Sequence, residues 1–219
     1  MENYKAIDFE NWPRKNHYLY YTNLVKAGYS MTINLDVTRL VSFCKAKELK
    51  FYPTFIYCAA AVVNSTENLK MFKDKDGMPC VWDKVVPNYT IFHDDDKTFS
   101  DMWTDFDFDF KTFYENITSD MEKYKDVKGV KAKDGQPPNF FCISCVPWVS
   151  YTGYSTYSGG GDPTFFPIIT FGKYTEENGT LKMPFTLTIS HAVCDGYHTA
   201  KFFDDLQKFI DAFADTKEA

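Results

Sequence analysis

The chain has 219 residues, of which 44% are hydrophobic and 18% aromatic, and a formal net charge of −6. A chain of this length buries roughly 70% of the surface of its unfolded form, so it needs neither disulfides nor a structural metal, and its aromatic content excludes intrinsic disorder. The acidic balance argues against a nucleic-acid partner, and the longest apolar run, Phe55 to Val63, is too short for the ~20 residues of a membrane span.

No repeat, low-complexity stretch or linker-like segment interrupts the sequence, which predicts a single domain over residues 1–219. The first residues, Met1 to Lys5, have neither the basic start nor the apolar stretch of a secretory signal. This predicts a cytoplasmic protein, in which the six cysteines are reduced and pack as small hydrophobic side chains.

Three helices are predicted between Asp36 and Tyr124. Two are short: one has an apolar face made by Val37, Leu40, Val41 and Cys44, and the other opens at Pro53 and continues through the run Phe55 to Val63. A longer amphipathic helix follows, whose apolar side chains recur every three or four residues at Phe106, Phe110, Phe113, Ile117, Met121 and Tyr124. Three acidic residues near its N-terminus, Asp105, Asp107 and Asp109, suit the positive end of the helix dipole.

Strands are predicted where β-branched and aromatic residues are bounded by Pro, Gly or Asp, at Cys80–Trp82, Tyr89–Phe92, Phe140–Val146, Phe166–Phe171 and Phe185–His191. The acidic run Asp94–Asp96 is predicted to be an exposed turn. Helices and strands alternate irregularly along the chain, which indicates an α/β fold.

The segment His191 to Gly196 is the most informative stretch, because three chemically capable side chains gather where a strand passes into a helix. Asp195 is well placed to cap the amphipathic helix that follows, and His191 ends an apolar strand face. A histidine at a strand end is more often a structural hydrogen-bonding group than a catalyst. The other histidines, His17, His93 and His198, form no metal-binding spacing.

Three further patterns predict no chemistry. Cys142 and Cys145 lie three apart on a predicted strand and therefore point to opposite faces. Cys194 lacks the electropositive surroundings that activate a thiol. The three glycines Gly159 to Gly161 are followed by no phosphate-binding motif and are predicted to form a flexible loop.

The sequence His-Ala-Val-Cys-Asp-Gly-Tyr-His at 191–198 resembles the active-site signature of the chloramphenicol acetyltransferases of the trimeric type, which lack hexapeptide repeats. The resemblance extends over nearly the whole chain. Further motifs resemble those of the family in the same order, at Trp12–Arg14, Tyr29–Thr32, Tyr52–Pro53, Val81–Asp83, Tyr89–His93, Thr98–Ser100, Ile143–Ser144, Val146–Trp148 and Pro167–Thr170.

The resemblance implies an acetyl-CoA-dependent O-acetyltransferase that works by direct transfer, without an acetyl-enzyme and without a metal. His191 would be the general base that removes the proton of an acceptor hydroxyl, and Ser144 would hydrogen-bond the tetrahedral oxyanion. Asp195 would pair with Arg14 to hold the turn beneath His191.

The resemblance also implies a two-layer sandwich of a mixed β-sheet and helices, the fold of CoA-dependent acyltransferases, assembled as a homotrimer in which His191 faces pocket residues of a neighbouring copy. The partners would be this second copy and a small hydroxyl acceptor. The implied acceptor pocket comprises Tyr21, Phe99, Tyr154, Thr156 and Thr170, and the implied coenzyme A channel comprises Trp148, Lys173 and Tyr174.

Four positions depart from the family pattern. Ser190 replaces a usual histidine and Cys142 an asparagine, while Tyr154 and Thr156 replace a phenylalanine and a leucine and add hydroxyls to the acceptor pocket. Chloramphenicol or a related hydroxylated compound is the expected acceptor. Two other classes stay open: an acyltransferase with a different acceptor, such as a dihydrolipoyl group, and a trimeric ligand-binding protein without activity.

Overall fold

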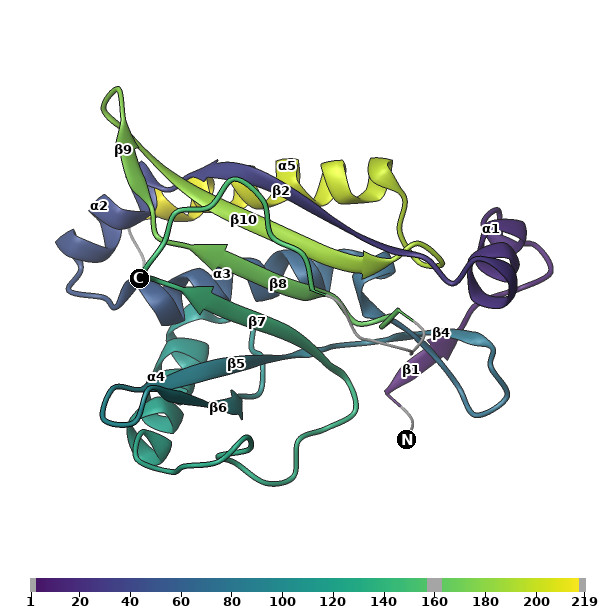
Figure 1. The fold of residues 1–219 in the computed structure, drawn as a ribbon, viewed down its shortest axis with the longest axis horizontal. Coiled ribbons are helices and arrows are strands. Elements are labelled where there is room, and N and C mark those ends of the chain that lie inside the picture. Colours follow the sequence, from purple (N-terminus) through teal and green to yellow (C-terminus); the bar gives the residue numbers. More distant parts are fainter. Residues whose placement is uncertain (1–2, 157–162, 217–219) are drawn as a thin grey trace.

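The computed structural model describes residues 3–156 and 163–216, and its main feature is one large mixed β-sheet. Its strands lie in the order β2 (Gly28–Asp36), β10 (Thr180–Ser190), β8 (Ile168–Gly172), β7 (Phe140–Val146), β5 (Val86–His93) and β6 (Thr98–Trp103), with β9 (Thr175–Glu177) also paired to β10. The pairs β5–β7 and β7–β8 are parallel and the others antiparallel, so the sheet is mixed as predicted (Figure 1).

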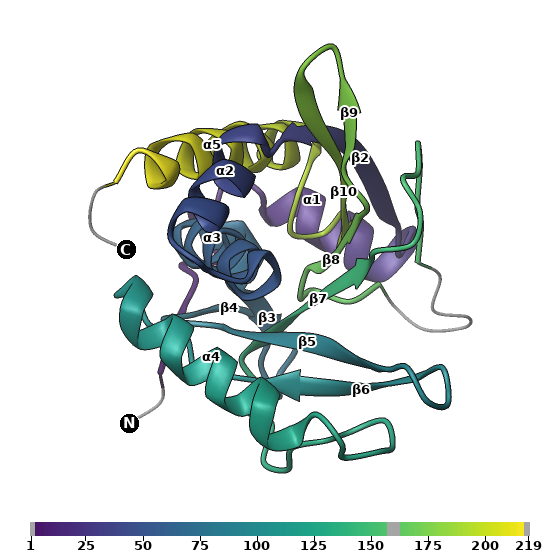
Figure 2. The same ribbon diagram turned by 90° about the vertical axis from the view of Figure 1, so that its left-hand side faces the viewer.

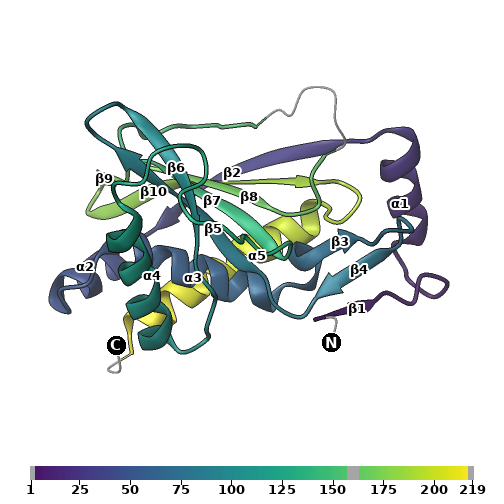
Figure 3. The ribbon, with the colours of Figure 1, turned by 90° about the horizontal axis from the view of Figure 1, so that it is seen from below.

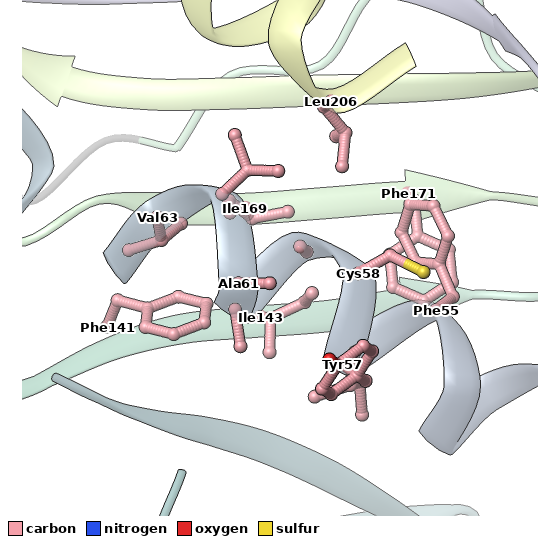
Figure 4. Packing of buried hydrophobic residues seen from close by; sticks show 14 of the residues in the cluster. Phe55, Tyr57, Cys58, Ala61, Val63, Phe141, Ile143, Ile169, Phe171 and Leu206 are labelled. Atoms are coloured by element: carbon pink, nitrogen blue, oxygen red, sulfur yellow. The ribbon is translucent and has the colours of Figure 1, made fainter. Parts of the chain in front are cut away.

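Four helices cover one face of this sheet: α2 (Thr38–Ala46), α3 (Phe51–Ser65), α4 (Phe110–Tyr124) and α5 (Gly196–Ala214) (Figure 2). Helix α3 lies at the centre of this layer, and its residues from Pro53 to Asn64 are all buried. Its Phe55 ring packs on Phe171 of β8 at 4.6 Å between ring centroids, and Ala61 and Val63 face Ile143 and Ile169 of the sheet (Figure 4). The sheet therefore has one face in the core and one face turned away from the helices.

A second, three-stranded sheet lies at one end of the molecule and has the order β1 (Tyr4–Ala6), β4 (Pro79–Trp82) and β3 (Met71–Lys73). The same end holds α1 (Lys15–Leu19) (Figure 3). Helix α1 continues directly into the π-helical turn η1 (Tyr20–Leu24), and the 3₁₀ turn η2 (Glu67–Lys70) links α3 to β3. These short elements surround the end of β10, where His191 follows.

Several predicted boundaries need correction. Helix α3 is not short, since it has 15 residues. Helix α4 begins at Phe110 rather than near Phe106, because Asp109 is its N-cap and its side chain accepts from Thr112 N–H. Strand β10 begins five residues earlier than predicted, at Thr180, and ends before His191. Strands β1, β2, β3, β6 and β9 were not predicted.

Other local predictions are confirmed. Strand β7 has the predicted bounds. Asp94 to Asp96 form an exposed turn between β5 and β6, where Asp96 and Asp95 bind Lys128. The glycines Gly159 to Gly161 lie outside the described residues.

Candidate active site

The turn from His191 to Asp195 connects β10 to α5, next to the small sheet and α1 (Figure 1). Its backbone amides are all bound. The N–H of His191 donates to the carbonyl of Ala27 at 2.9 Å, and that of Asp195 donates to Nδ1 of His198 at 3.2 Å. Ser190 accepts from the three amides between them: its Oγ from Ala192, and its carbonyl oxygen from Val193 and Cys194. The turn is therefore a well-defined structure rather than a loose loop.

Arg14, just before α1, reaches this turn across the fold. Its Nη1 forms a salt bridge with the Asp195 carboxylate. Its Nη2 lies 3.1 Å from the carbonyl oxygen of His191 and 3.3 Å from that of Ala192. Arg14 is only 9% exposed, so the guanidinium neutralises Asp195 and satisfies two carbonyls where water has little access.

The imidazole of His191 lies against two tyrosines. The Tyr21 ring is stacked on it at 4.0 Å between centroids and 5° between planes, and Tyr29 packs on it at 5.2 Å and 59°. The Tyr29 hydroxyl is 2.6 Å from Oγ1 of Thr199 in α5, and burial raises the pKa of Tyr29 to about 12. The His191 side chain keeps 31% of its surface exposed, and its Nδ1 lies 3.2 Å from Oδ1 of Asp195 without hydrogen-bond geometry. The ring is thus oriented but accessible.

Ser144 and Thr170 lie side by side on the face of the large sheet that is turned away from the helices. The register pairs Ser144 of β7 with Thr170 of β8, and Thr170 with Thr186 of β10. Hydroxyl groups continue this row in both directions, since Ser144 Oγ is 3.3 Å from Thr90 Oγ1 and Thr186 Oγ1 is 2.7 Å from Thr32 Oγ1. A row of hydroxyls therefore lies beside the predicted oxyanion donor, and within it Thr170 and Thr186 are buried.

The structure does not bring Ser144 and His191 together within one chain. Ser144 is level with Thr186 across the sheet, and His191 lies five residues further along β10. At about 3.3 Å per residue, this places the two roughly 16 Å apart along the strand direction. Strand β8, which lies between β7 and β10, separates them further across the sheet. Arg14, Asp195, Tyr21 and His191 form one cluster, and Ser144 and Thr170 form another.

The three residues predicted for the coenzyme A channel do lie together. Trp148, Lys173 and Tyr174 line a mainly apolar hollow of about 550 Å³, at the end of the sheet opposite to His191. Phe51 and Tyr52, at the start of α3, complete its wall and were not assigned from the sequence. The signal was present, since Tyr52–Pro53 is among the motifs that resemble the family.

The remaining predicted pocket residues are spread over the open face of the sheet. Phe99 of β6 is exposed opposite Phe92, whose ring packs on Trp148 at 4.6 Å. Tyr154 is exposed and packs on Tyr151 at 5.8 Å. Thr156 lines a separate hollow of about 450 Å³. These three therefore do not form one enclosed pocket in a single chain.

A covering segment, residues 147–156, crosses the open face and links the hollows. Tyr151 donates its hydroxyl proton to the carbonyl of Thr170 at 2.6 Å, and Lys173 N–H donates to the carbonyl of Val149 at 2.9 Å. The segment comes so close to β8 that a Cβ on Gly172 would lie 2.7 Å from the Val149 carbonyl oxygen and 2.9 Å from the Tyr151 ring. Gly172 is therefore required for this crossing.

The cysteines are poor nucleophiles where they lie. Cys194 is fully buried in the turn, and burial raises the pKa of its thiol to about 12. Burial also raises the pKa of Cys142 to about 11 and that of Cys145 to about 12. Their thiolates are scarce at neutral pH, which agrees with the prediction that these residues pack rather than react.

In residues 3–156 and 163–216, no three His, Cys, Asp or Glu side chains come together as a metal ion requires. None of the helices in the same ranges is both long and apolar enough to cross a membrane.

Comparisons with known proteins agree with the resemblance seen in the sequence. A protein-family model for chloramphenicol acetyltransferase matches residues 2–207. A chloramphenicol acetyltransferase from Clostridium perfringens is 39% identical over 205 residues, 94% of each chain, and one from Clostridium butyricum is 37% identical over 216 residues, 99% of each chain. A solved structure of a chloramphenicol acetyltransferase matches with a TM-score of 0.83 and 20% identity, covering 94% of this chain and 99% of that chain, which confirms the predicted fold class.

Proposed function

The chain belongs to the chloramphenicol acetyltransferase family of acyltransferases, and we propose that it transfers the acetyl group of acetyl-CoA to a hydroxyl of chloramphenicol or a related hydroxylated compound. The observation that carries the proposal is the turn at the end of β10. It presents one accessible imidazole on a backbone whose amides are all bound and whose carboxylate is paired with Arg14. Such a rigid support suits a general base, which must meet its proton at hydrogen-bond distance.

In this proposal His191 takes the proton of the acceptor hydroxyl while the hydroxyl oxygen attacks the thioester carbonyl. Asp195 and Arg14 hold the turn and do not move protons. Ser144 donates its hydroxyl proton to the oxyanion that develops on the former carbonyl oxygen, a contact that strengthens in the transition state. Collapse of this oxyanion expels the coenzyme A thiolate, and the proton held by His191 is returned to it.

We propose that the site is completed by a neighbouring copy in a homotrimer. The separation of His191 from Ser144 and from the hollow at Trp148 supports this arrangement, because one chain alone presents the base and the other groups at opposite ends of the sheet. Ring-like assembly through a repeated contact brings one end of a chain against the other end of its neighbour.

The two substrates are proposed to bind at different groups of residues. The acetyl-CoA arm is proposed to lie in the hollow of Trp148, Lys173 and Tyr174, whose apolar wall suits a pantetheine chain and whose lysine suits its phosphates. The acceptor is proposed to contact Tyr21, Phe99, Tyr154, Thr156 and Thr170. No step requires a metal. We propose that residues 1–219 work as one acetyltransferase domain in the cytoplasm, where free cysteines such as those seen here are maintained.

The test is release of the coenzyme A thiol by purified protein given acetyl-CoA with chloramphenicol, with dihydrolipoamide or with neither. We expect acceptor-dependent release with chloramphenicol, unchanged in excess chelator. Release only with dihydrolipoamide would assign the protein to the rival class of acyltransferase. Binding of chloramphenicol without release would favour a ligand-binding protein, and loss of activity in chelator that zinc or magnesium restores would contradict metal-free transfer.

Tyr154 and Thr156 lead to a prediction about kcat/KM for chloramphenicol. If the neighbouring copy encloses them, each hydroxyl left without a partner against an apolar ligand costs about 1 to 3 kcal/mol. The double variant Tyr154→Phe/Thr156→Leu is therefore expected to raise kcat/KM for chloramphenicol. An unchanged kcat/KM in steady-state assays would show that these hydroxyls do not limit the acceptor.

A further inference from the structure

We propose that Asn68 is a positioning residue for His191, an inference that rests on the proposed role of His191 as the general base. Asn68 lies in the turn η2, and its Nδ2 donates to the carbonyl oxygen of Val193 at 2.7 Å. Val193 is at the middle of the turn from His191 to Asp195 and is fully buried. Asn68 thus touches the turn that carries the base, although it comes from an element more than a hundred residues away in sequence.

The carbonyls of the turn show why this contact matters. Three successive carbonyls, those of His191, Ala192 and Val193, accept from side chains that belong to neither β10 nor α5. Arg14 binds the first two and Asn68 binds the third. Each of these three amide planes therefore has its orientation fixed by a side chain from outside the turn, and removing Asn68 frees one of them.

The side chains of Ala192, Val193 and Cys194 are fully buried, whereas the donors to the turn carbonyls lie beside a hollow. Arg14 and Asn68, together with His198, line this solvent-open hollow of about 450 Å³, so their hydrogen bonds to the carbonyls, unlike the buried side chains, lie near solvent. Asn68 itself is well anchored. It follows the buried helix α3, and its neighbour Leu69 is 1% exposed.

The hollow also predicts how the loss of Asn68 will appear. In Asn68→Ala, water can enter from the hollow and bind the Val193 carbonyl, so the fold is retained. Water supplies a hydrogen bond but does not fix the direction of the amide plane. We therefore expect a change in the position of the His191 imidazole with little change in thermal stability.

The experiment compares Asn68→Ala and Asn68→Asp with the matched control Asn139→Ala. Asn139 makes the same kind of bond, from Nδ2 to the carbonyl of Lys84 at 2.8 Å, and this carbonyl does not belong to the turn. For both Asn68 variants we expect kcat per folded protein to fall about 10-fold to 100-fold, because a small misplacement of a reacting group has effects of this size, with KM for acetyl-CoA unchanged. Asn139→Ala is expected to keep the wild-type kcat. If Asn68→Ala does not fold, the nearly isosteric Asn68→Asp, which lacks the donor, provides the measurement.

A second measurement does not depend on activity. The imidazole resonance of His191, assigned by its loss in His191→Gln, is expected to shift in the Asn68 variants and to stay in place in Asn139→Ala. Shifted resonances with an inactive wild-type protein would contradict the proposed function and leave the positioning contact intact. Equal kcat values in Asn68→Ala, Asn139→Ala and wild type, with an unmoved His191 resonance, would overturn the inference.

Discussion

At the scale of single residues, the two aromatic contacts of His191 distinguish it from the other histidines. Tyr21 and Tyr29 fix the plane of the ring, whereas His17 is exposed on α1 and His93 is buried with Nε2 2.8 Å from Ser100 Oγ. Orientation together with exposure is what proton abstraction from a bound hydroxyl requires.

Replacing His191 by alanine is expected to lower the rate of acetyl transfer by about 10² to 10⁴-fold or more, the usual contribution of a general base, while acetyl-CoA still binds. Steady-state kinetics and calorimetric titration with coenzyme A measure the two effects. His17→Ala is the control and should keep full activity. Near-normal turnover by His191→Ala, or an acetyl group found on Cys194 after rapid quenching, would contradict direct transfer to a hydroxyl activated by His191.

Ser144→Ala is expected to lower kcat much more than it changes either KM. An oxyanion donor in a water-poor site supplies ~2.7 to ~4 kcal/mol, nearly all of it in the transition state. The measurement is kcat and KM for both substrates, with Ser65→Ala as a control because that hydroxyl binds only the Ala61 carbonyl within α3. A rise in KM at constant kcat would show that Ser144 binds the ground state instead.

At the scale of elements, the first turn of α5 contains a titratable contact that supports the turn from His191 to Asp195. His198 accepts the N–H of Asp195 on Nδ1, and burial, followed by the charge of Arg14, lowers the pKa of His198 below its usual 6.5. The neutral ring is the form that can accept this bond.

Because folding lowers this pKa, the unfolded chain binds more protons than the folded chain between the two pKa values. The contribution of His198 to stability is therefore fully present above pH 6.5 and is lost as the pH falls through the folded-state pKa. We expect the wild-type Tm to fall more steeply on acidification than that of His198→Gln, whose side chain can still accept the bond but does not titrate. His17→Gln should keep the wild-type slope, and equal slopes for all three proteins would contradict this role.

The elements also show what the sequence could and could not predict. The bounds of β7 are predicted correctly by Pro137–Pro138 before it and Pro147 after it. Pro184 instead predicts a boundary but lies within β10, which begins at Thr180. Strand β2 was missed although Tyr29, Met31, Ile33 and Leu35 alternate with polar residues, a pattern typical of a strand with one buried face.

Only some of the contacts at the candidate site could be predicted from the sequence. The pairing of Arg14 with Asp195 was expected from the family resemblance and is present. The contact of Asn68 with Val193 was not predictable, because nothing local to η2 indicates that its amide faces a turn 125 residues away. The separation of Ser144 from His191 depends on strand register, which the sequence pattern alone does not fix across six strands.

At the scale of the whole molecule, the open face of the sheet and the two separated clusters lead to one prediction about assembly. Several large apolar side chains are exposed around them, among them Leu24, Phe99 and Trp148, which suits a surface covered by another copy. If each site combines His191 of one copy with Ser144 of the next, two inactive variants can restore each other.

Mixed assembly of His191→Ala with Ser144→Ala is therefore expected to recover activity. At equal amounts the recovery should reach up to about a quarter of the wild-type value, because one interface in four would combine an intact His191 with an intact Ser144. Each variant alone should stay inactive, and sedimentation should show a trimer. A stable, fully active monomer at micromolar concentration, or mixtures that recover nothing after unfolding and refolding together, would contradict a shared site.

Gly172 is important for both proposed ligand sites. It lines the hollow proposed for acetyl-CoA, and on its other side the chain that carries Trp148 and Tyr154 passes within contact of it. A single added methyl group at this position would push the covering segment outward and disturb both proposed ligand sites. A change of acceptor preference is therefore expected to arise further along the covering segment, at positions such as Tyr154 and Thr156. Side chains there can change without altering the contacts proposed for acetyl-CoA.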